Sequence, residues 1–551
     1  MEGDPDLILK NGCIYTLDRD QTWAQAIAIA SGQVIYVGSN QGVESYIGPK
    51  TATIDLEGKM VVPGFVDAHA HPSQAMDLVS NISLYSLDSV DEYQKAIAEF
   101  VDSHPERECY RGGGWTDTLF PNHGPPKELL DAIIPDRPVA LVSYDGHSLW
   151  VNSTALERAH ITKDTPDPAG GRIERTPKTG EPSGTLRETA ANLIKQVIPD
   201  YGLEERMNAL LAYQEMAVSA GITMVHDAML DPQSIAAFHA LAEQDQLKMR
   251  FRGSITLHPD KDLEQQVTAI LVERSKNRHP HFQTRAAKIF VDGVIEGGTA
   301  YLLEPYAHKP GYRGTPIWEP RALQAATADL FQENIQVHYH VIGDAAARMA
   351  LDAIEHARKI APGRDLRPLL THLQLVEDSD IRRCSKLGVI CIVQPFWFKI
   401  DDYYRELALP YLGKDRADRQ YPLRNLIDAG AIVASASDFP VTIPFDPLIA
   451  IQIGITRMEI GSTTAGVLFP QERATLEDLI LSFTLHGAYA NFMEDQTGSL
   501  EVGKQADLII LDRNLFQIPP DEISSTRVLL TMIAGKIVFQ DDSFTGTGGL
   551  Q

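Results

Sequence analysis

The middle of this chain alternates between apolar segments typical of strands and longer segments with helical periodicity, and this alternation limits the fold more than any other feature. Strand candidates occupy the segments 61–71, 222–228, 249–257, 286–293, 335–344, 367–375, 388–395 and 432–440. Between most of them, apolar residues recur at three- and four-residue spacing, as in amphipathic helices. Eight strands that alternate with helices predict a parallel (β/α)₈ TIM barrel. The alternative, an open doubly wound sheet, would usually carry a glycine-rich phosphate turn after its first strand, and the sequence has none there.

The two ends of the chain differ from this middle part, because both consist of short β-rich runs separated by turn signals such as NG, SGQ and AGK. Chain termini often lie close together. We therefore expect a small β-sandwich domain built from residues 1–61 and 498–551, and a barrel domain over residues 62–497. The gap between the first two barrel strands is far longer than a normal connection, which predicts an inserted subdomain at about 75–210.

Composition restricts the class of protein and its partners. Of the 551 residues, 44% are hydrophobic and 22% are charged, which is the balance of a globular protein, and the formal net charge is -25. Such a charge repels nucleic acids and anionic membrane surfaces. The N-terminus does not resemble a signal peptide, and the four cysteines form no CxxC pair. We expect a cytoplasmic protein that acts on a small molecule, without nucleic-acid or membrane partners, and a homo-oligomer, taken as a dimer.

Residue types that bind metals recur where the barrel strands end, which is where TIM barrels place their reacting groups. The first strand ends in His69 and His71, and side chains two residues apart on a strand share a face. Taken alone, this pair could equally be two histidines of a polar turn. His340, His372 and Asp438 close the fifth, sixth and eighth strands, however, and together the five residues predict a metal site. His338 shares the face of His340 but lies one layer deeper, so His340 is the preferred ligand.

Lys288 is unusual because it stands inside an apolar strand, where a bare ammonium is costly to bury. One interpretation is a structural lysine paired with a nearby carboxylate. The other is a lysine that is neutral enough to react with carbon dioxide, so that its carbamate becomes an anionic metal ligand.

The sequence resembles the amidohydrolase superfamily in PGFVDAHAHP, in the histidines of strands five and six and in SDFP. It is most similar to the YtcJ-like branch, which includes N-substituted formamide deformylases, in DGHSLWVNSTAL, GITMVHDA, KIFVDGVIEGGTA, HVIGDAA and GSLEVGKQADLIILD. The resemblance runs through nearly the whole chain. It implies that Lys288 is carboxylated and bridges two divalent ions, usually zinc, although related members work with one.

These observations predict a metal-dependent amidohydrolase that cleaves a non-peptide C–N bond of the amide type. A metal-activated hydroxide would attack the carbonyl, and Asp438 would act as general base and then as general acid. The expected ligands are His69, His71, Lys288, His340, His372 and Asp438, for one or two zinc ions, with manganese and iron as alternatives. A deaminase or a lactone or ester hydrolase on the same metal frame remains open, and so does a barrel that has lost its chemistry.

Four further residues are candidates for contacts with the substrate at the mouth of the barrel. Asp145 and His147 lie in the insert, His226 ends the second strand, and Trp397 follows the seventh. A plain loop or packing role is an equal alternative for each of them.

Overall fold

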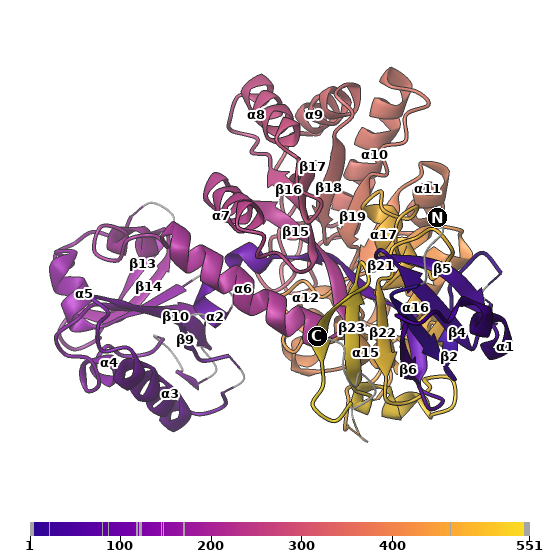
Figure 1. Cartoon of the computed structure of the whole chain (residues 1–551). Coiled ribbons are helices and arrows are strands. Elements are labelled where there is room, and N and C mark those ends of the chain that lie inside the picture. The colour runs from indigo at the N-terminus through magenta and orange to yellow at the C-terminus, as the bar shows by residue number, and fades with distance from the viewer. Residues whose placement is uncertain are drawn as a thin grey trace. The chain divides into compact units, whose positions relative to one another are not determined.

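We analysed a computed structural model of the chain (Figure 1). It describes residues 5–20, 22–79, 81–85, 87–116, 119–120, 124–144, 146, 148–168, 171–462, 464 and 466–544. The chain forms two compact units. The first comprises residues 1–71, 214–235 and 241–551, and the second comprises residues 72–213 and 236–240.

The centre of the first unit is a parallel sheet of eight strands. Its strands are β8 (Phe65–Ala70), β15 (Ile222–Leu230), β16 (Arg250–Thr256), β17 (Phe282–Phe290), β18 (Gln336–Val341), β19 (Leu369–His372), β20 (Ile390–Val393) and β21 (Ile432–Ser435), and each is a neighbour of the next. The last strand returns to the first, because the amide of Asp438 donates to the carbonyl of His69 at 2.9 Å and that of His71 donates to Phe439 at 2.6 Å. The predicted (β/α)₈ barrel is confirmed.

Helices follow most of these strands, and their sequences explain where they form. The longest stretches are α6 (Leu203–Ser219), α7 (Pro232–Glu243), α8 (Leu263–Ser275), α9 (Pro320–Gln332), α10 (Asp344–Ile360), α11 (Asp378–Lys386) and α15 (Pro447–Thr456). Shorter ones are α12 (Leu409–Leu412), α13 (Lys414–Ala417), α14 (Leu423–Asp428), α16 (Leu476–Ser482) and α17 (Leu485–Ala490). Helix α10 buries its alanine, leucine and isoleucine face, with Asp344 in its first turn and Arg358 and Lys359 in its last. These charges complement the helix dipole.

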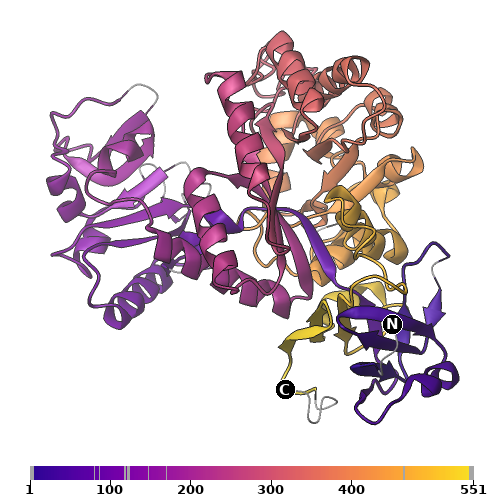
Figure 2. The same ribbon diagram turned by 45° about the horizontal axis from the view of Figure 1, so that its top comes forward.

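The two chain ends form a β-sandwich, as predicted (Figure 1 and Figure 2). One sheet contains β1 (Leu7–Lys10), β4 (Ala26–Ala30), β5 (Gln33–Gly38) and β6 (Ala52–Asp55). The other contains β2 (Cys13–Tyr15), β3 (Trp23–Ala24), β7 (Met60–Pro63), β22 (Leu508–Leu511), β23 (Val528–Ile533) and β24 (Lys536–Gln540). Strands β7 and β22 pair antiparallel, and residues from both ends, including Leu9, Ile27 and Leu530, share one apolar core.

The first predicted barrel strand, 61–71, is wrong as a single element. Residues up to Pro63 belong to β7 in the sandwich, whereas β8 starts at Phe65 in the barrel. Gly64 separates them, and a Cβ added to it would lie 2.2 Å from Cγ2 of Thr223. A glycine is therefore needed where the backbone passes this close to β15 on its way from one sheet to the other.

The second unit contains a mixed sheet in the order β13-β14-β12-β11-β10-β9. Its elements are β9 (Ile82–Ser83), α3 (Val90–Ser103), β10 (Tyr110–Trp115), α4 (Glu128–Asp131), β11 (Val139–Ser143), β12 (Ser148–Val151), α5 (Ser153–Arg158), β13 (Gly171–Arg175) and β14 (Pro182–Glu188). Its core packs Tyr93, Trp115 and Trp150. The predicted insert at about 75–210 falls within this unit, and the predicted domain boundaries stay predictions.

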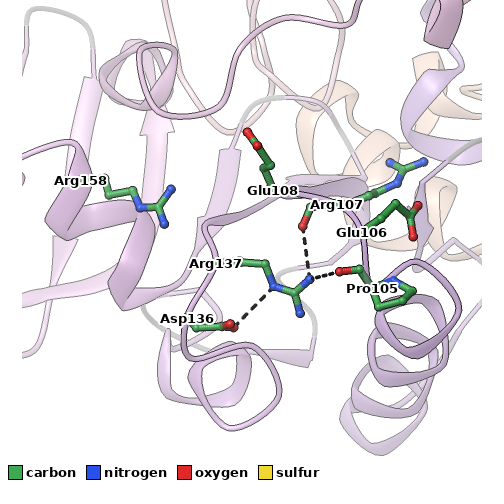
Figure 3. A pocket seen from close by; sticks show the side chains of 7 residues that line it. All are labelled: Pro105, Glu106, Arg107, Glu108, Asp136, Arg137 and Arg158. Carbon is green, nitrogen blue, oxygen red and sulfur yellow. Dashed lines mark hydrogen bonds and ion pairs between the residues drawn. The ribbon is translucent and has the colours of Figure 1, made fainter.

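Figure 3 shows a surface pocket of this second unit. Its lining is mainly charged and consists of Pro105, Glu106, Arg107, Glu108, Asp136, Arg137 and Arg158. Arg137 donates to the carbonyls of Pro105 and Arg107, so it ties the pocket's own walls together. None of the residues predicted for the metal site lines this pocket. Across the described part of the chain, no helix has the length and apolarity needed to cross a lipid bilayer.

Candidate metal centre

Three side chains converge at the seam where the barrel closes. Nε2 of His69 lies 3.2 Å and Nε2 of His71 lies 3.1 Å from the same oxygen, Oδ1 of Asp438. This oxygen accepts no hydrogen bond, although it is shielded from solvent. Potential ligand atoms of His69, His372 and Asp438 lie within 4.8 Å of one another. Side chains from the first, sixth and eighth strand ends thus surround one point.

His340 extends this cluster from the neighbouring strand. Its ring centroid lies 4.5 Å from that of His372, which in turn lies 5.1 Å from that of His69. Nε2 of His340 is 3.2 Å from the carbonyl of Gly293, and Nδ1 of His372 is 3.1 Å from Oε1 of Gln394. An imidazole nitrogen that donates to an oxygen carries the proton, so the opposite nitrogen of each ring keeps a lone pair for a ligand.

Lys288 lies on β17, where it pairs in register with His338 of β18, and its side chain is completely buried. Its Nζ is 3.4 Å from Nε2 of His69 and lies over the ring of Phe290 at 4.9 Å from the centroid. No carboxylate of the described residues forms an ion pair with it within 4.0 Å. Burial lowers the pKa of Lys288 to about 7, against a smaller opposing effect of the Asp438 charge. Near pH 7 the neutral amine of Lys288 is therefore populated to about the same extent as the ammonium.

Burial also keeps the histidines neutral. It lowers the pKa of His69 and His372 well below the ordinary value and that of His340 to about 3, and the nearby Lys288 charge acts in the same direction. A neutral imidazole is the form that binds a metal. Neutral imidazoles, one carboxylate with an unbonded buried oxygen and a lysine that can lose its proton form a donor set that fits a divalent cation.

The backbone is strained where two of these side chains leave their strands. His372 has φ of 81° and Asp438 has φ of 62°, a left-handed conformation that residues other than glycine rarely adopt. Asp67 holds the second of these turns. Its carboxylate accepts from the amide of Ser437 at 3.0 Å and from that of His69 at 3.2 Å, and also from the Ser437 hydroxyl. Asp67 thereby fixes His69 and Asp438 relative to each other.

Asp292 fixes the loop that follows β17 against the end of β18. Its carboxylate accepts from the amides of Tyr301, Ile342 and Gly343 at 2.9–3.0 Å. Burial nevertheless raises the pKa of Asp292 to about 7. The carboxylate touches neither His340 nor Lys288 in any described contact, so it orients the strand end rather than a ring.

The other predicted site residues fall into three groups. Asp145 and His147 lie outside the described residues. Trp397 is part of the cluster, because its ring stacks on His372 at 5.6 Å and 17° and its indole donates to Thr442 at 2.9 Å. His226 lies deeper in the barrel, and both of its ring nitrogens are engaged by Asn491 and Ser254.

Gln394 is a residue of this cluster that the sequence interpretation missed. It is fully buried, it accepts from His372, and its amide nitrogen has no hydrogen-bond partner. Its position directly after β20 was the available signal, since polar residues at strand ends face the mouth of a barrel.

Comparison with known proteins identifies the family of the chain. The model of the amidohydrolase family matches residues 52–539. The chain belongs to the amidohydrolase family. Three relatives are similar to it over 97% of its length: the protein LONG AFTER FAR-RED 3 of Arabidopsis thaliana (30% identity, 91% of that protein), the putative amidohydrolase YtcJ of Bacillus subtilis (29%, 99%) and the N-substituted formamide deformylase of Arthrobacter pascens (27%, 98%).

Among solved structures, an uncharacterized metal-dependent hydrolase from Pyrococcus horikoshii has the same fold, with a TM-score of 0.76 and 23% identity over 93% of this chain and 99% of that one. The predicted membership of the amidohydrolases, with its likeness to YtcJ and to the formamide deformylase, is confirmed. The chain is accordingly a member of the amidohydrolase family whose fold matches that of a protein described as a metal-dependent hydrolase.

Proposed function

We propose that this amidohydrolase cleaves an amide-type C–N bond of a small molecule and releases an acid and an amine. The observation that carries the proposal is the convergence of His69 and His71 on one carboxylate oxygen of Asp438, with Lys288 next to them. The name of one full-length relative, an N-substituted formamide deformylase, describes the same type of bond.

In this proposal His69, His71 and Lys288 would hold one divalent ion, and His340, His372 and Lys288 would hold a second. Bound zinc would supply Lewis acidity, which polarises a carbonyl and makes water nucleophilic near neutral pH. The neutral Lys288 amine would attack carbon dioxide: a C–N bond forms, one C=O π bond becomes a C–O⁻ and the N–H proton is released, so that a carbamate would replace the amine as an anionic ligand. Metal binding and carboxylation thereby remove the cost of burying this lysine.

Asp438 carries the proton in the proposed reaction. Its oxygen without a hydrogen bond lies between His69 and His71, and in the proposal it would accept a proton from the attacking water and then donate it to the leaving nitrogen. Gln394 offers a free amide N–H in the same cluster, and Trp397 covers His372 with an apolar face. A substrate with a polar amide and an apolar substituent suits these two surfaces.

The test combines metal content with a substrate panel. Protein purified without chelator is analysed for ions per chain in wild type, in Lys288→Met and in the control Lys504→Ala, whose lysine lies in the sandwich end of the chain. We expect about two ions per chain in wild type and in the control, and fewer in Lys288→Met.

The metal-loaded enzyme is then given N-formyl and N-acetyl amines, cyclic amides, lactones and aminated rings. Release of an amine with its acid supports the proposal. Turnover of lactones or aminated rings alone would replace it with the corresponding activity on the same frame. If wild type contains no metal and binds neither added zinc nor added manganese, the proposed metal site itself would be contradicted.

A further inference from the structure

A continuous chain of hydrogen bonds crosses the barrel interior beneath the metal centre. It joins Asn491, His226, Ser254, His338 and His69, and we call these five residues the imidazole chain. The distances between successive donor and acceptor atoms are 2.8, 2.7, 3.0 and 2.7 Å. The three middle residues lie on β15, β16 and β18 (Figure 1), and all five side chains are buried.

The direction of every bond in the imidazole chain follows from its far end. Nδ2 of Asn491 donates to the carbonyl of Gly487 at 2.9 Å, and a carbonyl only accepts. The amide therefore has its nitrogen toward Gly487 and its oxygen toward His226. Because that oxygen only accepts, Nδ1 of His226 must carry the proton, and Nε2 of His226 must accept.

The same reasoning continues toward the metal centre. The Ser254 hydroxyl donates to Nε2 of His226, so its oxygen accepts from Nδ1 of His338. Nε2 of His338 is then an acceptor, and it receives the proton of Nδ1 of His69. His69 is left with a bare Nε2, which is the nitrogen that faces Asp438, 3.2 Å away. The hydroxyl of Thr371 lies 2.9 Å from Nε2 of His338 and, because a hydroxyl can rotate to donate, it donates to that nitrogen in this order.

We infer that the imidazole chain fixes the tautomer of His69, so that its Nε2 lone pair is always presented to the metal, and that Ser254, His338, His226 and Asn491 are positioning residues for metal binding. Doubly protonated rings would bring unpaired charge into this interior and place two donors face to face, which buried polar networks avoid. The chain ends on a backbone carbonyl, not at solvent, so it sets polarity and does not conduct protons.

This inference rests on the proposed metal site, in which His69 is a ligand, but not on the bond that is cleaved. It also gives His226 a role other than substrate contact, since neither of its ring nitrogens is available.

The test is the dissociation constant of Zn²⁺ for the metal-free protein, measured by competition with a chelator. Ser254→Ala removes the hydroxyl that links His226 to His338 and frees His338 to change tautomer. We expect Zn²⁺ to bind about 10- to 100-fold more weakly, the usual effect of removing a hydrogen-bond partner of a metal-ligating histidine. Ser254→Thr keeps the hydroxyl and should restore wild-type affinity.

The matched control is Ser435→Ala, which removes another buried barrel hydroxyl, one that bonds to Ser482 at 2.7 Å. It should leave the affinity within about twofold of wild type, well below the second-sphere effect. Asn491→Leu, at the far end of the imidazole chain, provides a second variant in case Ser254→Ala does not fold, and it should also weaken binding.

Equal affinities for the Ser254→Ala and Ser435→Ala variants, at equal thermal stability, would overturn the inference while leaving the proposed function intact. If wild type binds zinc normally and Ser254→Ala binds it more weakly, but no amide is cleaved, the inference would stand and the proposed type of bond would be rejected. A wild-type protein that binds no zinc would remove both.

Discussion

Replacing Lys288 with methionine should stabilise the metal-free protein, although it removes a proposed ligand. The lysine has no carboxylate partner among the described ion pairs and is fully buried, so the folded state favours its neutral amine far more than the unfolded chain does. Its pKa falls from 10.5 in an unfolded chain to about 7 in the folded protein, so the ammonium form is favoured only in the unfolded chain. Folding therefore has to remove a proton at any pH between these values.

The magnitude follows from this shift. At pH 7 the cost is about 4 kcal/mol, and at pH 9 it declines to about 2 kcal/mol, because the unfolded chain then binds its proton less tightly. Methionine has a similar length and no charge, so Lys288→Met should raise the free energy of unfolding by about these amounts. The penalty is present below the unfolded pKa and disappears as the pH rises toward 10.5.

The assay is urea unfolding of chelator-treated wild type and Lys288→Met in buffers depleted of carbon dioxide, at pH 7 and at pH 9. A structural lysine paired with a carboxylate would behave in the opposite way, because its loss would leave a buried charge and cost about 3–5 kcal/mol. Destabilisation of the metal-free variant at pH 7 would refute the reasoning. A gain in the free energy of unfolding that is smaller at pH 9 than at pH 7 would identify Lys288 as a residue kept for binding at the expense of stability.

Three further predictions concern Asp438, His226 and the ion pair between Arg250 and Asp507. Asp438→Asn should lower kcat/KM about 10²- to 10⁴-fold with the fold intact, because an amide cannot carry the proton. The rate is measured on the substrate found in the panel, and an unchanged kcat/KM would exclude the proposed role of Asp438. Burial lowers the pKa of His226 to about 4, so its neutral form stabilises the protein above pH 6.5 and this advantage is lost as the pH falls toward 4. The stability difference between wild type and His226→Gln should thus shrink by about 2 kcal/mol between pH 7.5 and pH 5 in urea unfolding, and a constant difference would contradict the shift. Arg250→Met should lower the free energy of unfolding by about 3–5 kcal/mol in the same assay, because it leaves Asp507 buried without the guanidinium that lies 2.6 Å away. The double variant Arg250→Met with Asp507→Leu should recover part of that loss. Additive losses would show that the two residues do not act as a pair.

Much of the fold was accessible from the sequence because the barrel repeats a simple pattern. Every barrel strand was located within a few residues, and the paired chain ends were anticipated from their short β-rich runs. The error at 61–71 has a physical cause. Met60–Pro63 and Phe65–Ala70 are both apolar and extended, and hydrophobic pattern does not say which sheet a strand joins. Only the close passage of Gly64 against Thr223 separates the two.

The sequence by itself determined which residues stand at the carboxyl ends of the strands, and hence the histidines, the lysine and the aspartate, because strand position and side-chain alternation are local properties. The tertiary structure decided what cannot be read locally. It brought Asn491, from the far end of the barrel domain, to His226, and joined His226 through Ser254 and His338 to His69. Hydrogen-bond direction depends on atoms that meet only when the barrel closes, since these partners are up to 269 residues apart in the chain. The residue types proposed as ligands are thus set by the strand sequences, whereas the tautomer inferred for His69 follows from the closed fold.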